Sequence, residues 1–132
     1  MVITDETQSK QLENCVTING SLTFQSFTYS NVSFPNLLFI EGSLKIQEID
    51  NLASFRQLLP NLVHIHAVVQ KLEFALSITN NKDLEKLEFN RLMRIDSGVV
   101  QVYKNPRLCL NDITSWLQIQ ENTSPIKKRI EV

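Results

Sequence analysis

Apolar and polar residues alternate in four short segments that recur along most of the chain. These segments are residues 22–24, 44–46, 76–78 and 100–102. Strict alternation predicts half-buried β-strands, because neighbouring side chains of a strand point to opposite faces. The residues expected to stack as neighbours in one inward ladder are Leu22, Leu44, Leu76 and Val100. The polar residues between the apolar ones are expected to face solvent.

A second motif recurs ahead of these segments. Residues 35–40 read Pro-Asn-Leu-Leu-Phe-Ile, residues 60–65 read Pro-Asn-Leu-Val-His-Ile, and residues 90–95 form a looser copy, Asn-Arg-Leu-Met-Arg-Ile. Connections of this length do not suit tight hairpins, whereas parallel stacking of repeat units suits them well. The sequence therefore predicts a solenoid, a right-handed parallel β-helix that is leucine-rich-repeat-like.

Short helices are expected between the strands. Leu52, Phe55, Leu58 and Leu59 lie at helical spacing and Pro60 ends the run. The same pattern returns in Ile113, Trp116 and Leu117 after Asp112, a good N-cap residue, and predicts a capping helix that closes the end of the solenoid. The third unit is longer than the others, so residues 68–74 are expected to bulge out as a loop or offset strand.

Composition narrows the function. The 132 residues suffice for one domain, and 13 basic against 14 acidic residues give a net charge of −1. A net charge so close to zero provides no overall electrostatic attraction for nucleic acid or an anionic membrane. The longest useful apolar run, residues 37–40, is far shorter than the roughly 20 residues of a spanning helix. The first fourteen residues lack the apolar stretch of a secretory signal, so the chain is either intracellular or preceded by a signal upstream.

Residues that could carry chemistry have simpler explanations. His64 and His66 share one strand face, but no carboxylate or cysteine lies close in sequence, so surface histidines are favoured over a metal site. Asp83, Glu85 and Glu88 alternate with lysines, as on a solvated edge. Residues 127–129, Lys-Lys-Arg, are expected to be a solvated terminus. With three glycines and no catalytic motif, the sequence predicts neither an enzyme nor a cofactor.

Two features bear on the compartment. Asn-x-Ser/Thr glycosylation acceptors occur at Asn19, Asn31 and Asn122, with Asn31 in a polar loop between units as the best candidate. Cys15 and Cys109 are compatible with one disulfide, two free thiols or two bridges to absent partners. Because they are expected near opposite ends of the stack, we predict that they do not bond to each other.

Several motifs together resemble the receptor L domain of the insulin receptor and the epidermal growth factor receptor. Residues 12–22, with Leu-Glu-Asn-Cys and Ile-Asn-Gly-Ser-Leu, are similar to its opening motif. Residues 34–37 and 59–62 resemble its turns between units, and residues 105–109, Asn-Pro-Arg-Leu-Cys, its closing motif. The resemblance implies an L-like domain over residues 12–119, a poorly assigned segment over 1–11 and a C-terminal tail over 120–132.

The chain departs from this family in three ways. Family cysteines at the positions of Cys15 and Cys109 normally pair with cysteines upstream and downstream, and neither partner occurs here. Residues 1–11 do not resemble the family's first strand well. In the insulin receptor the outward strand face carries apolar and aromatic hormone contacts, whereas the matching residues here are polar.

The resemblance implies a non-catalytic extracellular or cell-surface module of a receptor-like protein, which binds a protein or peptide ligand or another ectodomain. We expect the partner site on the outward strand face, with Tyr103 as its aromatic anchor and Lys45 near its centre. The residues of this face are Thr23, Gln25, Lys45, Gln47, Ser77, Thr79, Gln101 and Tyr103. The alternatives are an intracellular leucine-rich-repeat-like scaffold with both cysteines free, and a divergent L domain without a hormone ligand.

Overall fold

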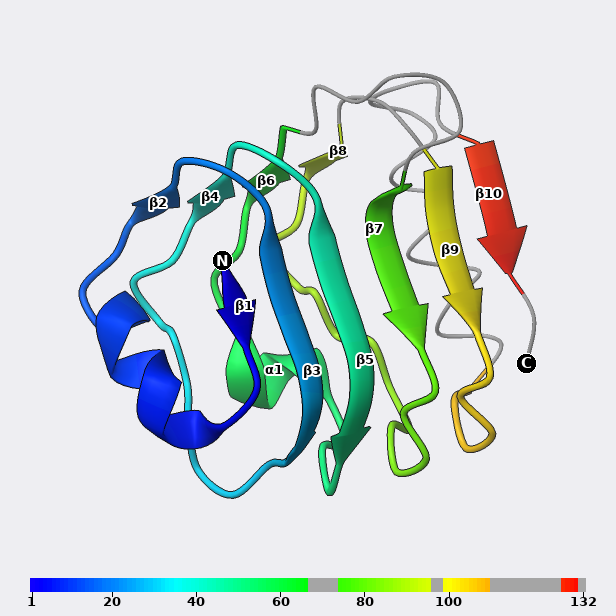
Figure 1. Ribbon diagram of the computed structural model, residues 1–132. Coiled ribbons are helices and arrows are strands. Elements are labelled where there is room, and N and C mark those ends of the chain that lie inside the picture. The colour runs from blue at the N-terminus through cyan, green and yellow to red at the C-terminus, as the bar shows by residue number, and fades with distance from the viewer. Residues whose placement is uncertain (67–73, 96–98, 110–126, 131–132) are drawn as a thin grey trace.

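The strands form two parallel sheets with few helices between them. The computed structural model describes residues 1–66, 74–95, 99–109 and 127–130. The large sheet has the order β1-β3-β5-β7-β9-β10 and the small sheet the order β2-β4-β6-β8 (Figure 1). The strands of the large sheet are β1 Val2–Ile3, β3 Leu22–Thr28, β5 Leu44–Asp50, β7 Phe74–Thr79, β9 Val99–Tyr103 and β10 Lys127–Ile130. Those of the small sheet are β2 Thr17–Ile18, β4 Phe39–Ile40, β6 His64–Ile65 and β8 Arg94–Ile95.

Each short strand of the small sheet is followed in the chain by a longer strand of the large sheet. This alternation is compatible with a solenoid. The predicted ladder is confirmed, because Leu22 pairs with Leu44, Leu44 with Leu76, and Leu76 with Val100, all in parallel register and all fully buried. Leucine and valine on successive strands thus build one continuous core between the two sheets.

The asparagines of the two Pro-Asn-Leu copies make equivalent hydrogen bonds. The Asn36 side chain donates to the Glu13 carbonyl at 3.3 Å, and the Asn61 side chain donates to the Pro35 carbonyl at 2.8 Å. Each asparagine therefore ties its own repeat unit to the preceding one. The leucines that follow, Leu37 and Leu62, are buried in the core.

Glycine is required where two repeat units come closest. A Cβ atom on Gly42 would lie 2.6 Å from the Gly20 carbonyl carbon and 2.6 Å from the Ser21 nitrogen. Next to this contact the Ser43 hydroxyl donates to the Ser21 hydroxyl at 3.0 Å. Gly42 thus allows the two backbones to approach, and the serines beside the two glycines link them.

The helical spacing after β5 produces one short helix, α1 Phe55–Leu58. Ser54 caps its start, and Ser54 and Gln57 form a reciprocal capping box. Phe55 is fully buried and stacks on Phe89 with ring centroids 4.7 Å apart. This helix agrees with the predicted run, although it is shorter.

The two ends of the chain differ from expectation. The poorly assigned residues 1–11 contain β1, which pairs with β3, and most of a 3-10 helix, η1 Glu6–Leu12. The segment expected to be a tail contains β10, which pairs with β9 in parallel. Each strand extends a sheet edge, where unpaired backbone groups of β3 and β9 attract a further strand.

The long third unit is described at its beginning and its end, up to residue 66 and from residue 74. Phe74, expected in the bulging loop, begins β7, and the register shifts between Phe74 and Leu76. Residues 68–73 of that loop lie outside the described residues, as does the capping helix predicted around Ile113, Trp116 and Leu117.

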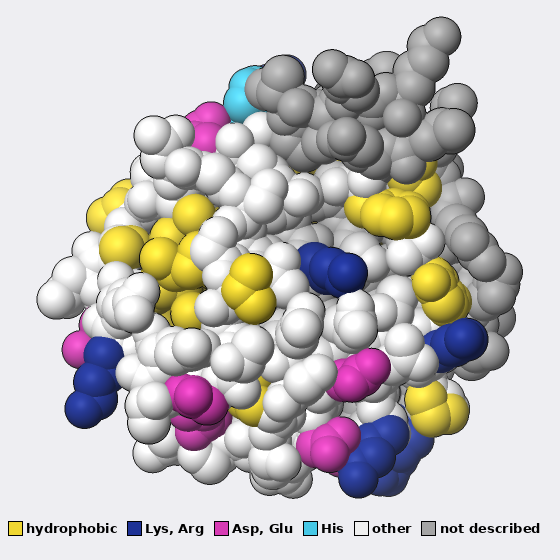
Figure 2. All heavy atoms as spheres, in the orientation of Figure 1, with side chains coloured by type: hydrophobic (Ala, Val, Ile, Leu, Met, Phe, Trp, Pro, Cys, Tyr) yellow, Lys and Arg dark blue, Asp and Glu magenta, His cyan; other side chains and the backbone are white. Residues whose placement is uncertain are grey.

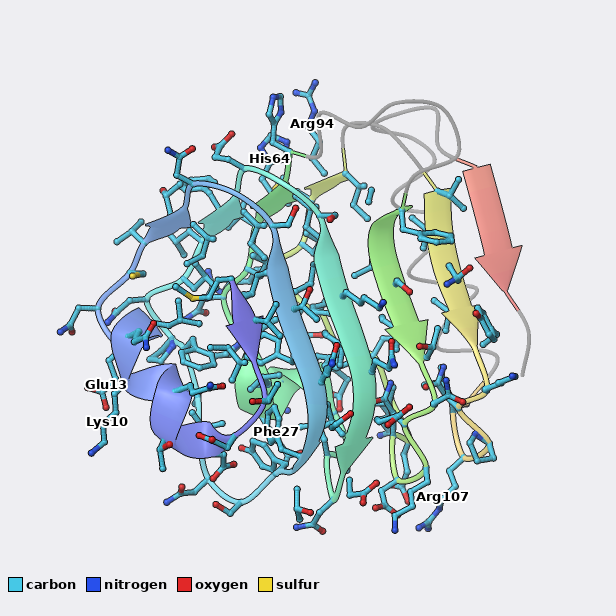
Figure 3. The ribbon with its side chains drawn as sticks, viewed as in Figure 1. Lys10, Glu13, Phe27, His64, Arg94 and Arg107 are labelled. Atoms are coloured by element: carbon cyan, nitrogen blue, oxygen red, sulfur yellow. The ribbon has the colours of Figure 1, made fainter. Side chains whose placement is uncertain are left out.

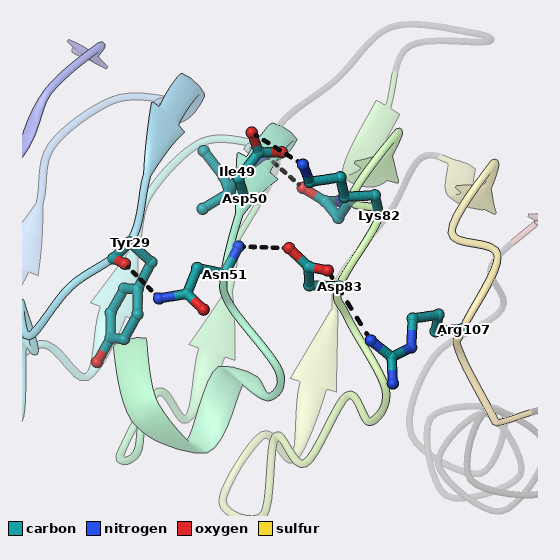
Figure 4. A network of polar contacts seen from close by, with 8 residues as sticks. Tyr29, Ile49, Asp50, Asn51, Lys82, Asp83 and Arg107 are labelled. Carbon is teal, nitrogen blue, oxygen red and sulfur yellow. Dashed lines mark hydrogen bonds and ion pairs between the residues drawn. The ribbon is translucent and has the colours of Figure 1, made fainter.

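A network of polar contacts runs along the turns that follow the large-sheet strands (Figure 4). Asn51 donates through its side chain to the Tyr29 carbonyl at 3.1 Å and through its backbone N–H to Asp83 at 2.8 Å. Arg107 continues it, 4.0 Å from Asp83 and 3.0 Å from Glu85. These acids and their neighbouring lysines do form a largely solvated edge, as predicted.

A buried asparagine pair lies beneath this edge. Asn81 and Asn105 are both fully buried. The Ile49 N–H donates to Asn81 Oδ1 at 2.9 Å, and Asn81 Nδ2 donates to Asn105 Oδ1 at 3.0 Å and to the Ile46 carbonyl at 3.3 Å. These side chains satisfy backbone groups where the strands end and the chain turns.

Candidate functional site

The eight outward residues expected to form a partner site lie on four neighbouring strands of the large sheet. Parallel pairing places them in two rows. The first row is Thr23, Lys45, Ser77 and Gln101, and the second is Gln25, Gln47, Thr79 and Tyr103. Figure 2 looks onto this face and shows that most of its surface is neither charged nor hydrophobic side chain, with a basic side chain near its middle.

The face is hollowed rather than flat. Residues of β5, β7 and β9 line a hollow of about 430 Å³. Its lining residues are Lys45, Gln47, Phe74, Ser77, Thr79, Asn80, Gln101 and Tyr103. Six of the eight predicted site residues therefore meet around one space, and Thr23 and Gln25 lie beside it on β3.

The expectation that every outward residue faces solvent is wrong for three of them. Ser77 is 2% exposed, Thr79 4% and Gln101 5%. The short hydroxyl side chains of β7 lie between longer side chains of β5 and β9, and Gln101 bends toward them and donates to the Ser77 hydroxyl at 3.1 Å. They form the floor of the hollow.

The charge of the hollow comes from Lys45. Its side chain is exposed, and it forms no ion pair within the part of the chain that the structure describes. At one side stands Tyr103, whose ring lies 5.9 Å from the ammonium group of Lys104. Phe74, 42% exposed, lines the hollow as its second aromatic side chain.

A second hollow of about 390 Å³ adjoins the first and shares Asn80 with it. Here the strands kink, since Ser26 and Glu48 at equivalent positions of β3 and β5 have φ of 58° and 55°. Glu48 accepts a hydrogen bond from Ser26 at 3.1 Å, and Asp50 lies 3.7 Å from Lys82. With two acids and one base, this second hollow is net negative.

The remaining candidates lie elsewhere. His64 and His66 project at the small sheet, with ring centroids 5.4 Å apart, and Figure 3 shows His64 beside Arg94. No three His, Cys, Asp or Glu side chains among residues 1–66, 74–95, 99–109 and 127–130 are grouped as metal ligands. The described helices include none that is long and apolar enough to cross a membrane.

The glycosylation acceptors and the cysteines bear on whether the chain is exported. Asn19 and Asn31 are exposed, and Asn122 lies outside the described residues. Cys15 and Cys109 are both free thiols, so they do not bond to each other. Cys15 is partly buried and its thiol points to the Gln11 carbonyl at 3.6 Å, whereas Cys109 is exposed.

Tyr29, near the N-terminal helix, has a shifted pKa. Burial, together with the negative charge of Glu6, raises the pKa of Tyr29. Glu6 also accepts hydrogen bonds from the Ser30 N–H and hydroxyl, and so ties η1 to the loop after β3. This contact is structural and lies away from the hollow around Lys45.

Sequence reasoning missed Asn81 and Asn105 as structural polar residues. Each stands two residues after the end of a long strand, β7 or β9, and next to a residue of positive φ, Asn80 or Lys104. The repeated placement of an asparagine after a predicted strand was the available signal.

The comparisons with known proteins agree with these features. The sequence profile described as Receptor L domain matches residues 14–120. An insulin-like peptide receptor of Branchiostoma lanceolatum is 32% identical over 119 residues, which are 86% of this chain and 9% of that protein.

Two other relatives give the same picture. An insulin-like growth factor 1 receptor of Xenopus laevis is 32% identical over 118 residues, 85% of this chain and 9% of that protein. An insulin-like receptor of Drosophila melanogaster is 33% identical over 112 residues, 83% of this chain and 5% of that protein. The chain thus spans less than a tenth of the length of these relatives.

Proposed function

Because this chain belongs to the receptor L domain family, we propose that it is a non-catalytic, extracellular module of a receptor-like protein. It binds a peptide or protein ligand, or a second ectodomain. The names of its relatives, which are receptors for insulin-like peptides and growth factors, support this proposal. The exposed acceptors Asn19 and Asn31 fit an exported, glycosylated chain.

The fold that we propose for this module is a right-handed parallel β-solenoid over residues 12–119. The regular alternation between small-sheet and large-sheet strands supports it, since each unit passes once through both sheets. In such a fold every unit adds one strand to the same face, so a rigid platform grows with the number of units.

The single observation that carries the binding site is the hollow on this platform. Uncovered parallel sheet faces are unusual, because most parallel sheets are buried on both sides. Here the outward rows converge on one space of about 430 Å³, within the size range of ligand sites. We place the partner on Thr23, Gln25, Lys45, Gln47, Ser77, Thr79, Gln101 and Tyr103.

The polarity of the face distinguishes two versions of this function. An apolar hormone surface needs several aromatic anchors, and the described lining of this hollow contains two, Phe74 and Tyr103. The second candidate function is therefore that of a divergent L domain without a hormone ligand. Its partner is more polar than an insulin-like hormone. An intracellular scaffold is not favoured, since the relatives are receptors.

Selection of randomised twelve-residue peptides on the 132-residue chain tests the site. Selected peptides should bind Tyr103→Ala and Lys45→Glu more weakly by about 1–3 kcal/mol, the range of central interface contacts. Met93→Ala is the matched control, because Met93 is 64% exposed and precedes a strand of the small sheet. Peptides that bind both site variants with unchanged affinity would place the partner site elsewhere.

A further inference from the structure

We propose that the hollow around Lys45 binds the carboxylate of an aspartate or glutamate side chain of the partner. This inference rests on the proposed function and specifies the chemistry that the face recognises. The partner is then a protein or peptide whose central contact is acidic.

Every polar side chain around the hollow can donate a hydrogen bond, and Lys45 can only donate. Lys45 supplies an ammonium group, Gln47 and Gln101 supply amide N–H groups, and Ser77 and Thr79 supply hydroxyls. Gln47 uses one of its two N–H donors on Glu48 and Gln101 uses one of its two on the Ser77 hydroxyl, which leaves one N–H of each amide and the Ser77 hydroxyl hydrogen available. A carboxylate, which only accepts hydrogen bonds, matches this set.

The balance of charge favours one anionic group. Among the described lining residues of this hollow there is no Asp or Glu, so the formal charge of this part of the lining is that of Lys45. Burying a ligand carboxylate beside an unpaired ammonium group turns two solvated charges into a charge-assisted hydrogen bond. Phosphate groups are commonly bound by several cations or by arginine forks, and the lining residues that the structure describes include one lysine.

The neighbouring, negatively charged hollow restricts where the partner's carboxylate can bind. Across Asn80 stand Glu48 and Asp50, of which only Asp50 has a basic partner, Lys82. A partner carboxylate is repelled there and attracted to Lys45. The two adjoining hollows of opposite charge therefore hold an acidic residue in one orientation, by attraction on one side and repulsion on the other.

The aromatic lining residues of the hollow favour a carboxylate that belongs to a protein side chain over a small free anion. Phe74 and Tyr103 line the hollow together with Lys45, so apolar surface adjoins the cation. A protein side chain brings methylene groups and neighbouring residues that cover such rings, which a small inorganic anion cannot do. An acidic residue within a peptide segment thus uses all of the lining groups.

The test is an NMR titration of the 15N-labelled chain with two matched probes. N-acetylglutamate methylamide should shift the side-chain amide signals of Gln47 and Gln101 saturably, and N-acetylglutamine methylamide should bind at least about fivefold more weakly, since charged hydrogen bonds are about 1 kcal/mol stronger. Lys45→Met should remove the difference between the probes, and Lys45→Arg should keep it. Equal binding of both probes, or no shift of these amides, overturns the inference.

The same variants separate this inference from the proposed function. If selected peptides lose affinity with Tyr103→Ala but bind Lys45→Met unchanged, and tolerate replacement of their acids by amides, the face is correct and the acidic contact is wrong. If the selected peptides bind both variants with unchanged affinity, both the proposed site and the acidic contact are wrong.

Discussion

Replacing Asn81 should reveal how much the buried asparagine pair contributes to stability. In Asn81→Ala the Ile49 N–H loses its acceptor at 2.9 Å, while Asn105 Oδ1 and the Ile46 carbonyl each lose a donor. An unsatisfied buried donor costs about 1–3 kcal/mol, and each lost net hydrogen bond about 0.5–1.5 kcal/mol. The free energy of unfolding should therefore fall by about 2–6 kcal/mol, a large share of the 5–15 kcal/mol typical of a domain.

The assay is urea unfolding at pH 7, supported by the thermal midpoint. A loss of this size lowers the Tm by about 6–24 °C for a chain of this length. Lys82→Ala is the neighbouring control, because its ion pair with Asp50 is exposed and such pairs are worth about 0–1 kcal/mol. A loss below about 1 kcal/mol in Asn81→Ala would refute the role given to this side chain.

The variant Asn81→Asp should have a free energy of unfolding that depends on pH. The carboxylate still accepts from Ile49, but it faces Asn105 Oδ1 and the Ile46 carbonyl without donors. Burial and these acceptors should raise its folded pKa above the unfolded value of about 3.9. The variant is then least stable above the folded pKa, and its deficit relative to wild type should shrink as the pH falls from 7 toward 4. A deficit that stays constant over that range would contradict this account.

Three further predictions concern other parts of the molecule. Gly42→Ala should lower the free energy of unfolding by about 1–3 kcal/mol in urea unfolding, because the added Cβ meets backbone atoms of Gly20 and Ser21 at 2.6 Å; an unchanged midpoint would argue against so close an approach. Since its folded pKa is raised, Tyr29 should stabilise the protein fully below about pH 10 and progressively less above it, so Tyr29→Phe should lose less stability than wild type in alkaline unfolding. After secretion from animal cells, Asn31→Gln should remove one glycosidase-sensitive mass increment, and a wild-type chain without any such increment would speak for the intracellular alternative.

The core strands could be predicted from sequence because their signal is local. Alternation within residues 22–24 or 44–46 indicates which side chains point into the core. The spacing of the repeats makes parallel stacking the simplest arrangement. The observed pairing of Leu22, Leu44 and Leu76 confirms that reasoning. The family resemblance followed from motifs in these same units.

The ends of the sheets could not be predicted in this way. Val2–Ile3 is too short to show alternation, and residues 127–130 are mostly charged. Both become strands because β3 and β9 offer an unpaired edge, and such an edge exists only once the sheet has formed.

The sequence determined which residues share the outward face, because strand periodicity alone decides that. Only the tertiary structure decided that Ser77 and Thr79 lie at the bottom of a hollow while Lys45 stands at its rim, since depth depends on the length of the side chains on neighbouring strands. Likewise Asn80 and Asn81 are the same residue type side by side, yet one is exposed and the other fully buried. Burial of a polar side chain is set by the backbone groups it meets, and these belong to other repeat units more than twenty residues away.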